Sequence, residues 1–146
     1  MKTAVVYFSK HHGNTRKLLD AIAQKHELTL IDVTEKQDIK LEEFDRIGFA
    51  SGIYYGSFAK QLLKFASEHL PVGKKIFLIS SYGAAGKHSE DSIRRIVSEK
   101  NCEVIGSYGC VGFDTFGPFK LIGGLHKGHP TEEDIAGAVK FYDDLG

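Results

Sequence analysis

The segment 9–15, SKHHGNT, combines residue types that can bind a phosphate group. It lies between the apolar run TAVVYF and the run RKLLDAIAQK, in which apolar residues recur at helical spacing. A loop that leads into a helix presents backbone N–H groups and the positive end of the helix dipole to an anion. Ser9, Asn14 and Thr15 add hydroxyl and amide donors, Gly13 allows close backbone approach, and no carboxylate would repel the anion. The segment therefore predicts a phosphate-binding loop.

The remaining residues of this segment, Lys10, His11 and His12, can add positive charge or hydrogen bonds. The segment is not a nucleoside-triphosphate loop, because no Gly-Lys-Ser/Thr follows at the required spacing, and it lacks the three spaced glycines of dinucleotide-binding proteins. The alternative is that Asn14 or Thr15 only caps the following helix, a contribution of about 1 kcal/mol.

The elements that must position this loop alternate along the chain. Apolar, β-branched runs predict strands at 3–8, 28–33, 46–50, 75–80 and 103–113. Four segments have helical patterns: one follows 9–15, one ends before Pro71, one starts after a cap at Ser89 and one starts at Thr131. A short or irregular helix is also expected within 34–44. This alternation predicts an α/β fold, a doubly wound parallel sheet with helices on both faces, in a single domain 1–146.

Four segments follow predicted strands and therefore meet at one edge of such a sheet. They are 9–15, 51–58, 81–88 and 114–130, and all are rich in Gly, Ser, aromatic residues or His, whereas 24–27 and 71–74 on the opposite edge are plain. Ligands of open α/β sheets bind outside the carboxyl ends of the strands, where the strand order reverses. The contrast between the two edges predicts one functional edge.

The stretch YFSKHHGNT resembles the phosphate loop of the flavodoxin family, Ser/Thr-x-Thr-Gly-x-Thr after the first strand. Ser9, Gly13 and Thr15 match the first hydroxyl, the glycine and the last threonine of this pattern. Between Ser9 and Gly13 the chain has one residue more than the pattern. The five strands and the turns fit the family over nearly the whole chain. The resemblance implies a flavodoxin-like five-stranded parallel sheet of order 2-1-3-4-5 and an FMN cofactor.

In the family, aromatic residues of the second and third turns enclose the flavin ring. The resemblance implies this role for the tyrosines of ASGIYYGSF and SSYGAAGKH, with a peptide at Gly56 that reorients toward the reduced flavin. The alternatives are that one of Tyr54 and Tyr55 packs inward and that Tyr82 is a surface turn residue. The predicted cofactor-binding set is Ser9, Lys10, His11, His12, Gly13, Asn14, Thr15, Ile53, Tyr54, Tyr55, Gly56, Ser81, Tyr82 and Gly83.

The segment 114–130, DTFGPFKLIGGLHKGHP, is long for a connection from a strand to a helix. After Asp114 it contains only basic charged side chains, and it also contains apolar residues where a linker would be polar. Either it packs on the sheet edge as a structural cap, or it forms a partly apolar, basic rim beside the flavin, on which a redox partner protein could dock.

The formal net charge is zero, so no overall field draws the chain to nucleic acid or to anionic lipid. We expect no membrane span and no signal peptide, and we expect Cys102 and Cys110 to be reduced thiols in a cytoplasmic protein. The leading functional hypothesis is an FMN-binding electron carrier between a reductase and an electron acceptor. The alternative is an FMN-dependent oxidoreductase acting on a quinone or porphyrin-precursor type acceptor, and a receiver-type signalling module is disfavoured because Ser9 and Lys10 replace its acidic pair.

Overall fold

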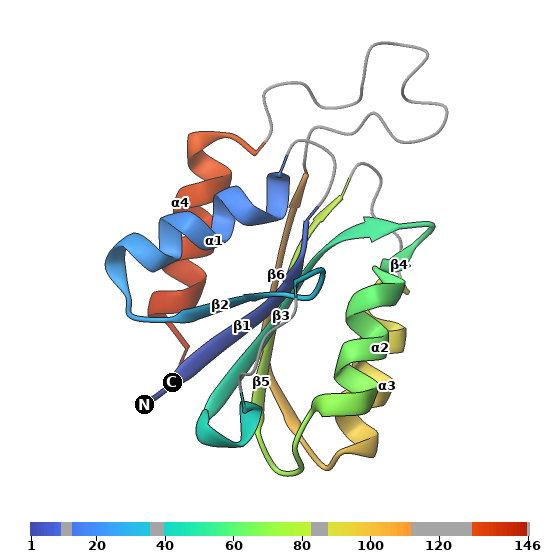
Figure 1. The fold of residues 1–146 in the computed structure, drawn as a ribbon. Coiled ribbons are helices and arrows are strands. Elements are labelled where there is room, and N and C mark those ends of the chain that lie inside the picture. The colour runs from blue at the N-terminus through green and yellow to red at the C-terminus, as the bar shows by residue number, and fades with distance from the viewer. Residues whose placement is uncertain (10–12, 36–39, 83–87, 112–129, 146) are drawn as a thin grey trace.

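The computed structural model describes residues 1–9, 13–35, 40–82, 88–111 and 130–145 (Figure 1). The strands are β1 (Thr3–Phe8), β2 (Thr29–Asp32), β3 (Arg46–Tyr54), β4 (Ser57–Phe58), β5 (Lys75–Tyr82) and β6 (Glu103–Val111). The helices are α1 (Asn14–Lys25), α2 (Lys60–His69), α3 (Asp91–Glu99) and α4 (Glu132–Asp143), with a 3-10 turn, η1 (Leu41–Glu43).

Five of the strands form a parallel sheet in the order β2-β1-β3-β5-β6, and β4 pairs antiparallel with the end of β3. Without β4 this is the predicted order 2-1-3-4-5, so the fold prediction is confirmed. The chain passes from β1 to β2 on one side and then to β3 on the other. The strand order therefore reverses between β1 and β3, where a ligand crevice is expected.

Helices α1 and α4 cover one face of the sheet, and α2 and α3 cover the other (Figure 1). Alternate residues of β1 serve the two cores: Val5 and Tyr7 pack with α1 and α4, and Val6 and Phe8 pack with α2 and α3. Both sets are buried, which explains why the strands read as continuous apolar runs.

The helix ends test the sequence predictions individually. At α4 the Thr131 hydroxyl accepts a hydrogen bond from the Asp134 N–H (3.1 Å), and the Asp134 carboxylate accepts one from the Thr131 N–H (2.8 Å). This capping box confirms the predicted start. The predicted cap at Ser89 is wrong, because α3 begins at Asp91 after Glu90 and has no side-chain cap.

The hairpin formed by β3 and β4 is absent from the predictions, which treated 51–58 as a turn. Strand β3 extends to Tyr54, and Tyr54 pairs with Ser57 across a two-residue turn. Within 34–44 the short helix is the 3-10 turn Leu41–Glu43, while 36–39 lie outside the described residues.

Candidate functional site

Helix α1 begins without a side-chain cap. Its N-cap residue is Gly13, which has φ 64°, a left-handed conformation that glycine adopts without steric cost. Asn14 and Thr15 are the first two helical residues, so the alternative that one of them caps α1 is wrong. The first turn has no acidic residue, so no side chain there neutralises the positive end of the helix dipole beside the loop.

The Thr15 hydroxyl lies 2.9 Å from the Ser81 hydroxyl, and both residues are buried. This contact joins the start of α1 to the end of β5, between residues 66 positions apart in the sequence. The first and third predicted turns are therefore in direct contact at the carboxyl edge of the sheet. A hydroxyl that accepts one hydrogen bond can still donate another, so Thr15 can bind Ser81 and an anion together.

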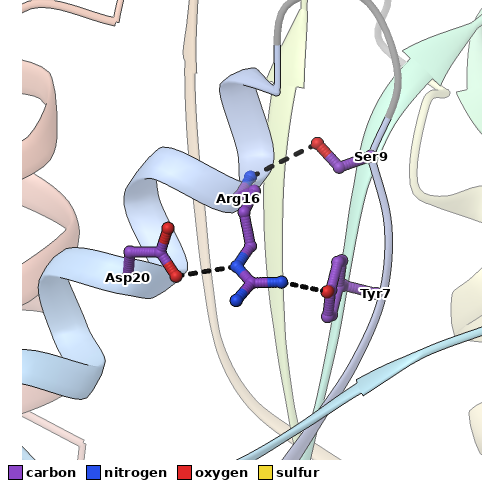
Figure 2. Close-up of polar contacts among 4 residues, drawn as sticks. All are labelled: Tyr7, Ser9, Arg16 and Asp20. Atoms are coloured by element: carbon purple, nitrogen blue, oxygen red, sulfur yellow. Dashed lines mark hydrogen bonds and ion pairs between the residues drawn. The ribbon is translucent and has the colours of Figure 1, made fainter.

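Beside the loop, two polar groups hold the Arg16 guanidinium and a third binds the Arg16 backbone (Figure 2). The Arg16 N–H donates to the Ser9 hydroxyl (3.4 Å), while the Arg16 guanidinium donates to Asp20 (2.7 Å) and to the Tyr7 hydroxyl. The bond to Asp20 raises the pKa of Arg16. Burial raises the pKa of Tyr7, although the nearby Arg16 acts in the opposite direction. The cluster therefore holds a charged Arg16 beside a neutral Tyr7.

Sequence reasoning missed Arg16 because it looked only within 9–15. The available signal was the pairing of Arg16 with Asp20 four residues later, which places both side chains on one face of the helix.

Ser51 was also missed as an individual residue. Its hydroxyl accepts from the Ala59 N–H (3.0 Å), and this bond fixes the start of α2 against the hairpin.

The two hairpin tyrosines differ in their surroundings. Tyr54 is half-buried and packs edge-on against Phe8, with ring centroids 5.8 Å apart. Its hydroxyl lies over Gly52, where a Cβ atom would come within 2.8 Å of it. Tyr55 is 90% exposed at the tip of the hairpin. Of the pair, Tyr54 is the ring that packs inward and Tyr55 is the ring that faces outward.

Tyr55 and Gly56 form the two-residue turn of the hairpin, with φ 51° and φ 76°. Two consecutive left-handed residues are typical of a type I′ turn, which is usually made by Asn-Gly or Gly-Gly. A tyrosine in this conformation costs about 1 kcal/mol. The hairpin therefore holds an exposed aromatic ring in an unfavourable backbone conformation, at the carboxyl edge of the sheet.

Several predicted site residues are not described by the structure. They are Lys10, His11, His12 and Gly83. Residues 114–129 also lie outside the described residues, whereas Pro130 is described and is buried. Tyr82 is described: it ends β5 and is half-buried, beside Gly109. Within the described ranges, no three His, Cys, Asp or Glu side chains are grouped to hold a metal ion.

The two cysteines are free thiols. Burial raises the pKa of Cys110 to about 12, so this thiol stays protonated at neutral pH and is a poor nucleophile.

The described site places Ser9, Gly13, Asn14 and Thr15 at the switch point, with Ser81 bonded to Thr15 and the hairpin on β3 beside it. An uncapped helix start with adjacent hydroxyls fits a phosphate group, and an aromatic hairpin fits a flat ring. These features define a doubly wound α/β protein with a candidate anion site at its switch point.

Residues 4–109 match the family described as Flavodoxin domain. An uncharacterized protein of Methanocaldococcus jannaschii is 36% identical over 143 residues, which are 97% of this chain and 95% of that protein. The chain belongs to the flavodoxin family, as the phosphate-loop resemblance predicted.

Solved structures agree on the fold. A flavodoxin from the domain Archaea has a TM-score of 0.69 at 19% identity and covers 98% of this chain and 95% of its own. A Fusobacterium nucleatum flavodoxin, solved bound to flavin mononucleotide, has a TM-score of 0.62 at 16% identity and covers 98% of each chain. Within the described residues, no helix is long and apolar enough to cross a membrane.

Proposed function

We propose that this protein binds FMN and carries electrons between redox partner proteins, a reductase and an electron acceptor. The observation that carries the proposal is the start of α1, where Gly13 is left-handed, no side chain caps the helix and the Thr15 hydroxyl lies at the first turn. Membership of the flavodoxin family and the FMN bound by the Fusobacterium nucleatum flavodoxin support this assignment.

In this proposal the phosphate of FMN binds at the start of α1. Ser9 and Thr15 supply hydroxyl donors, and Lys10, His11 and His12 supply further donors or charge from the same loop. Hydrogen bonds to a charged phosphate are stronger than those between neutral groups, so this end anchors the cofactor.

The ring of FMN lies between the second and third turns in the same proposal, against Ile53, Tyr54, Tyr55, Gly56, Ser81, Tyr82 and Gly83. FMN supplies one- and two-electron chemistry when bound. The tyrosines cover apolar faces and exclude water, and the turn backbone meets the polar ring edge. Gly56 already has a left-handed φ of 76°, and glycine lets its peptide reorient at low cost.

A second candidate is an FMN-dependent oxidoreductase that acts on a quinone or porphyrin-precursor acceptor. One observation favours it: an apolar cavity of about 660 Å³ lies beside the β3–β4 hairpin. Such a volume suits a small molecule and is not needed by a protein that only exchanges electrons with other proteins.

Reduction of the FMN-loaded protein distinguishes the two candidates. A carrier should be reduced slowly by NADH or NADPH alone and rapidly after a flavodoxin reductase is added, as absorbance in the flavin band would show. Rapid turnover of NAD(P)H and a quinone by the purified protein alone would favour the oxidoreductase. In the carrier proposal, an acidic partner docks on the basic residues Lys120 and Lys127 of the segment 114–130. Lys120→Glu with Lys127→Glu should therefore slow exchange with that partner and leave FMN affinity unchanged.

A further inference from the structure

A mainly apolar groove of about 440 Å³ lies between α1 and α4, on the face of the sheet opposite α2 and α3 (Figure 1). Its described lining residues come from the second half of α1 and from both ends and the middle of α4. None of them belongs to the 9–15 loop or to the β3–β4 hairpin. The groove is therefore separate from the proposed cofactor site.

The apolar part of the groove is built on the core of the protein. Ile135 and Val139 are half-buried and pack against the core beneath α1 and α4, and the half-buried Ala21 of α1 lines the same groove. Ala136, midway along α4, is exposed beside them. A side chain as small as that of alanine allows a second helix to approach α4 closely.

The groove is acidic at one end and basic at the other. Glu132 is the first residue of α4, and Lys140 lies in the last turn of the same helix. Lys25, the last residue of α1, also lines the groove. Neither Glu132 nor Lys25 forms an ion pair with any described residue, and the pair of Lys140 with Asp144 (3.0 Å) is exposed and contributes little.

The ends of the two helices lie next to each other. His26, which follows α1, bonds to the carboxylate of Asp143, the last residue of α4. Lys25 and Lys140 therefore lie at the same end of the groove. Asp143 lines this end too, but its charge is already shared with His26.

The charges of α4 are self-complementary about Ala136. Glu132 and Lys140 lie four residues before and after it, or about 6 Å in each direction along the helix. This spacing keeps the three residues on one face of α4, and all three are exposed. A second α4 that runs antiparallel about a two-fold axis at Ala136 places Glu132 of each copy beside Lys140 of the other. A parallel second helix would bring like charges together.

We propose that this groove is the interface of a homodimer, in which α4 of each copy packs antiparallel against the groove of the other. The two-fold axis repeats every contact, so the dimer contains two pairs of Glu132 with Lys140, with Lys25 beside each pair. Between them, Ala136 and the apolar floor of the groove are covered. Two short helices make a small interface, so we expect association weaker than about 1 µM.

Sedimentation equilibrium of the full chain, from micromolar to millimolar protein, measures the dissociation constant of the dimer. Ala136→Arg should weaken association at least about tenfold, because it places a large cation on the axis against its own copy. Glu132→Lys and Lys140→Glu should each weaken it about tenfold, since each turns two attractive contacts into repulsive ones. The matched controls Glu68→Lys and Lys64→Glu, at exposed positions of α2, should change it less than about twofold.

An equimolar mixture of Glu132→Lys and Lys140→Glu tests the antiparallel register. Each variant alone has like charges at both contacts of its homodimer. In a mixed dimer both contacts join opposite charges, so the mixture should form heterodimers with about the affinity of the unmodified protein. Sedimentation velocity with a fluorescent label on one of the two variants measures this association.

Three results would overturn the homodimer: a monomer at millimolar protein, a dimer that Ala136→Arg does not weaken, or a mixture that associates no better than its two components. FMN titration of the same variants should give unchanged affinity, because none of the altered residues belongs to the proposed cofactor site. Failure of FMN to bind the unmodified protein would therefore remove the proposed carrier function and leave the dimer result intact.

Discussion

The contact between Thr15 and Ser81 allows a structural role and a ligand-binding role to be separated. Thr15→Val keeps the side-chain shape and removes the hydroxyl, and it leaves the Ser81 hydroxyl buried without its 2.9 Å partner. An unsatisfied buried polar group costs about 1–3 kcal/mol, so this variant and Ser81→Ala should each lower the free energy of unfolding by that amount. The double variant removes both hydroxyls and should lose little more than either single variant.

The affinity for FMN should follow another pattern. If Ser81 donates to Thr15, the Thr15 hydroxyl is left to donate to the phosphate, so Thr15→Val should weaken FMN binding by about 1.5–3 kcal/mol, or roughly 10- to 150-fold. Ser81→Ala should weaken it only a few-fold, because the Thr15 hydroxyl remains. The double variant should be about as stable as either single variant, and its affinity for FMN should stay as low as that of Thr15→Val.

Urea denaturation of the cofactor-free protein measures the stability cycle, and FMN titration measures the affinity cycle. Ser80→Ala is the matched control, since Ser80 is buried on the same strand and does not contact Thr15 through a hydrogen bond in the described structure. Its effect should add to that of Thr15→Val. Additive stability losses for Thr15→Val and Ser81→Ala, or FMN affinity unchanged by Thr15→Val, would refute the reasoning.

Three further predictions follow from packing and ionisation. Gly48→Ala should lower the free energy of unfolding by about 1–3 kcal/mol, because a Cβ there would lie 2.4 Å from the ring of the fully buried Phe77; calorimetric melting with an unchanged Tm would contradict this. Burial raises the pKa of Cys110 from 9.0 and that of Tyr108 from 10.0, each to about 12, so the folded protein keeps protons that the unfolded chain releases. The contribution of these two groups to stability should therefore be constant below about pH 9 and be lost toward pH 12, and a urea series with no loss of stability between pH 9 and pH 12 would disprove it. Tyr55→Ala should increase the fluorescence of bound FMN if that ring stacks on the flavin, and unchanged emission would exclude such stacking.

Much of the fold could be predicted because its signals are local. The apolar runs identified all five parallel strands, and Thr131 followed by acidic residues indicated the start of α4. The order of the strands required the family resemblance, since local patterns do not specify which strands are neighbours. The hairpin was missed because Tyr55-Gly56 lacks the Asn-Gly or Asp-Gly signal of its turn type, and β4 has only two residues.

The parts that could not be predicted depend on contacts between distant residues. No local pattern indicates that Thr15 meets Ser81. Arg46, at the start of β3, is 7% exposed, lies over the Tyr142 ring and donates to its hydroxyl (2.9 Å), although a strand pattern suggests an exposed arginine there. The start of α3 also depends on context, because Glu90 bonds with Arg94 where Ser89 was expected to cap.

The central claim is that the start of α1 binds the phosphate of FMN. Its most direct test is a comparison of FMN with riboflavin, which has the same ring and no phosphate, by titration of the cofactor-free protein. Two or more hydrogen bonds to a charged group contribute at least about 3 kcal/mol, so FMN should bind one-to-one and riboflavin should bind at least about 100-fold more weakly. Equal affinity for the two molecules, or no uptake of FMN, would contradict the claim.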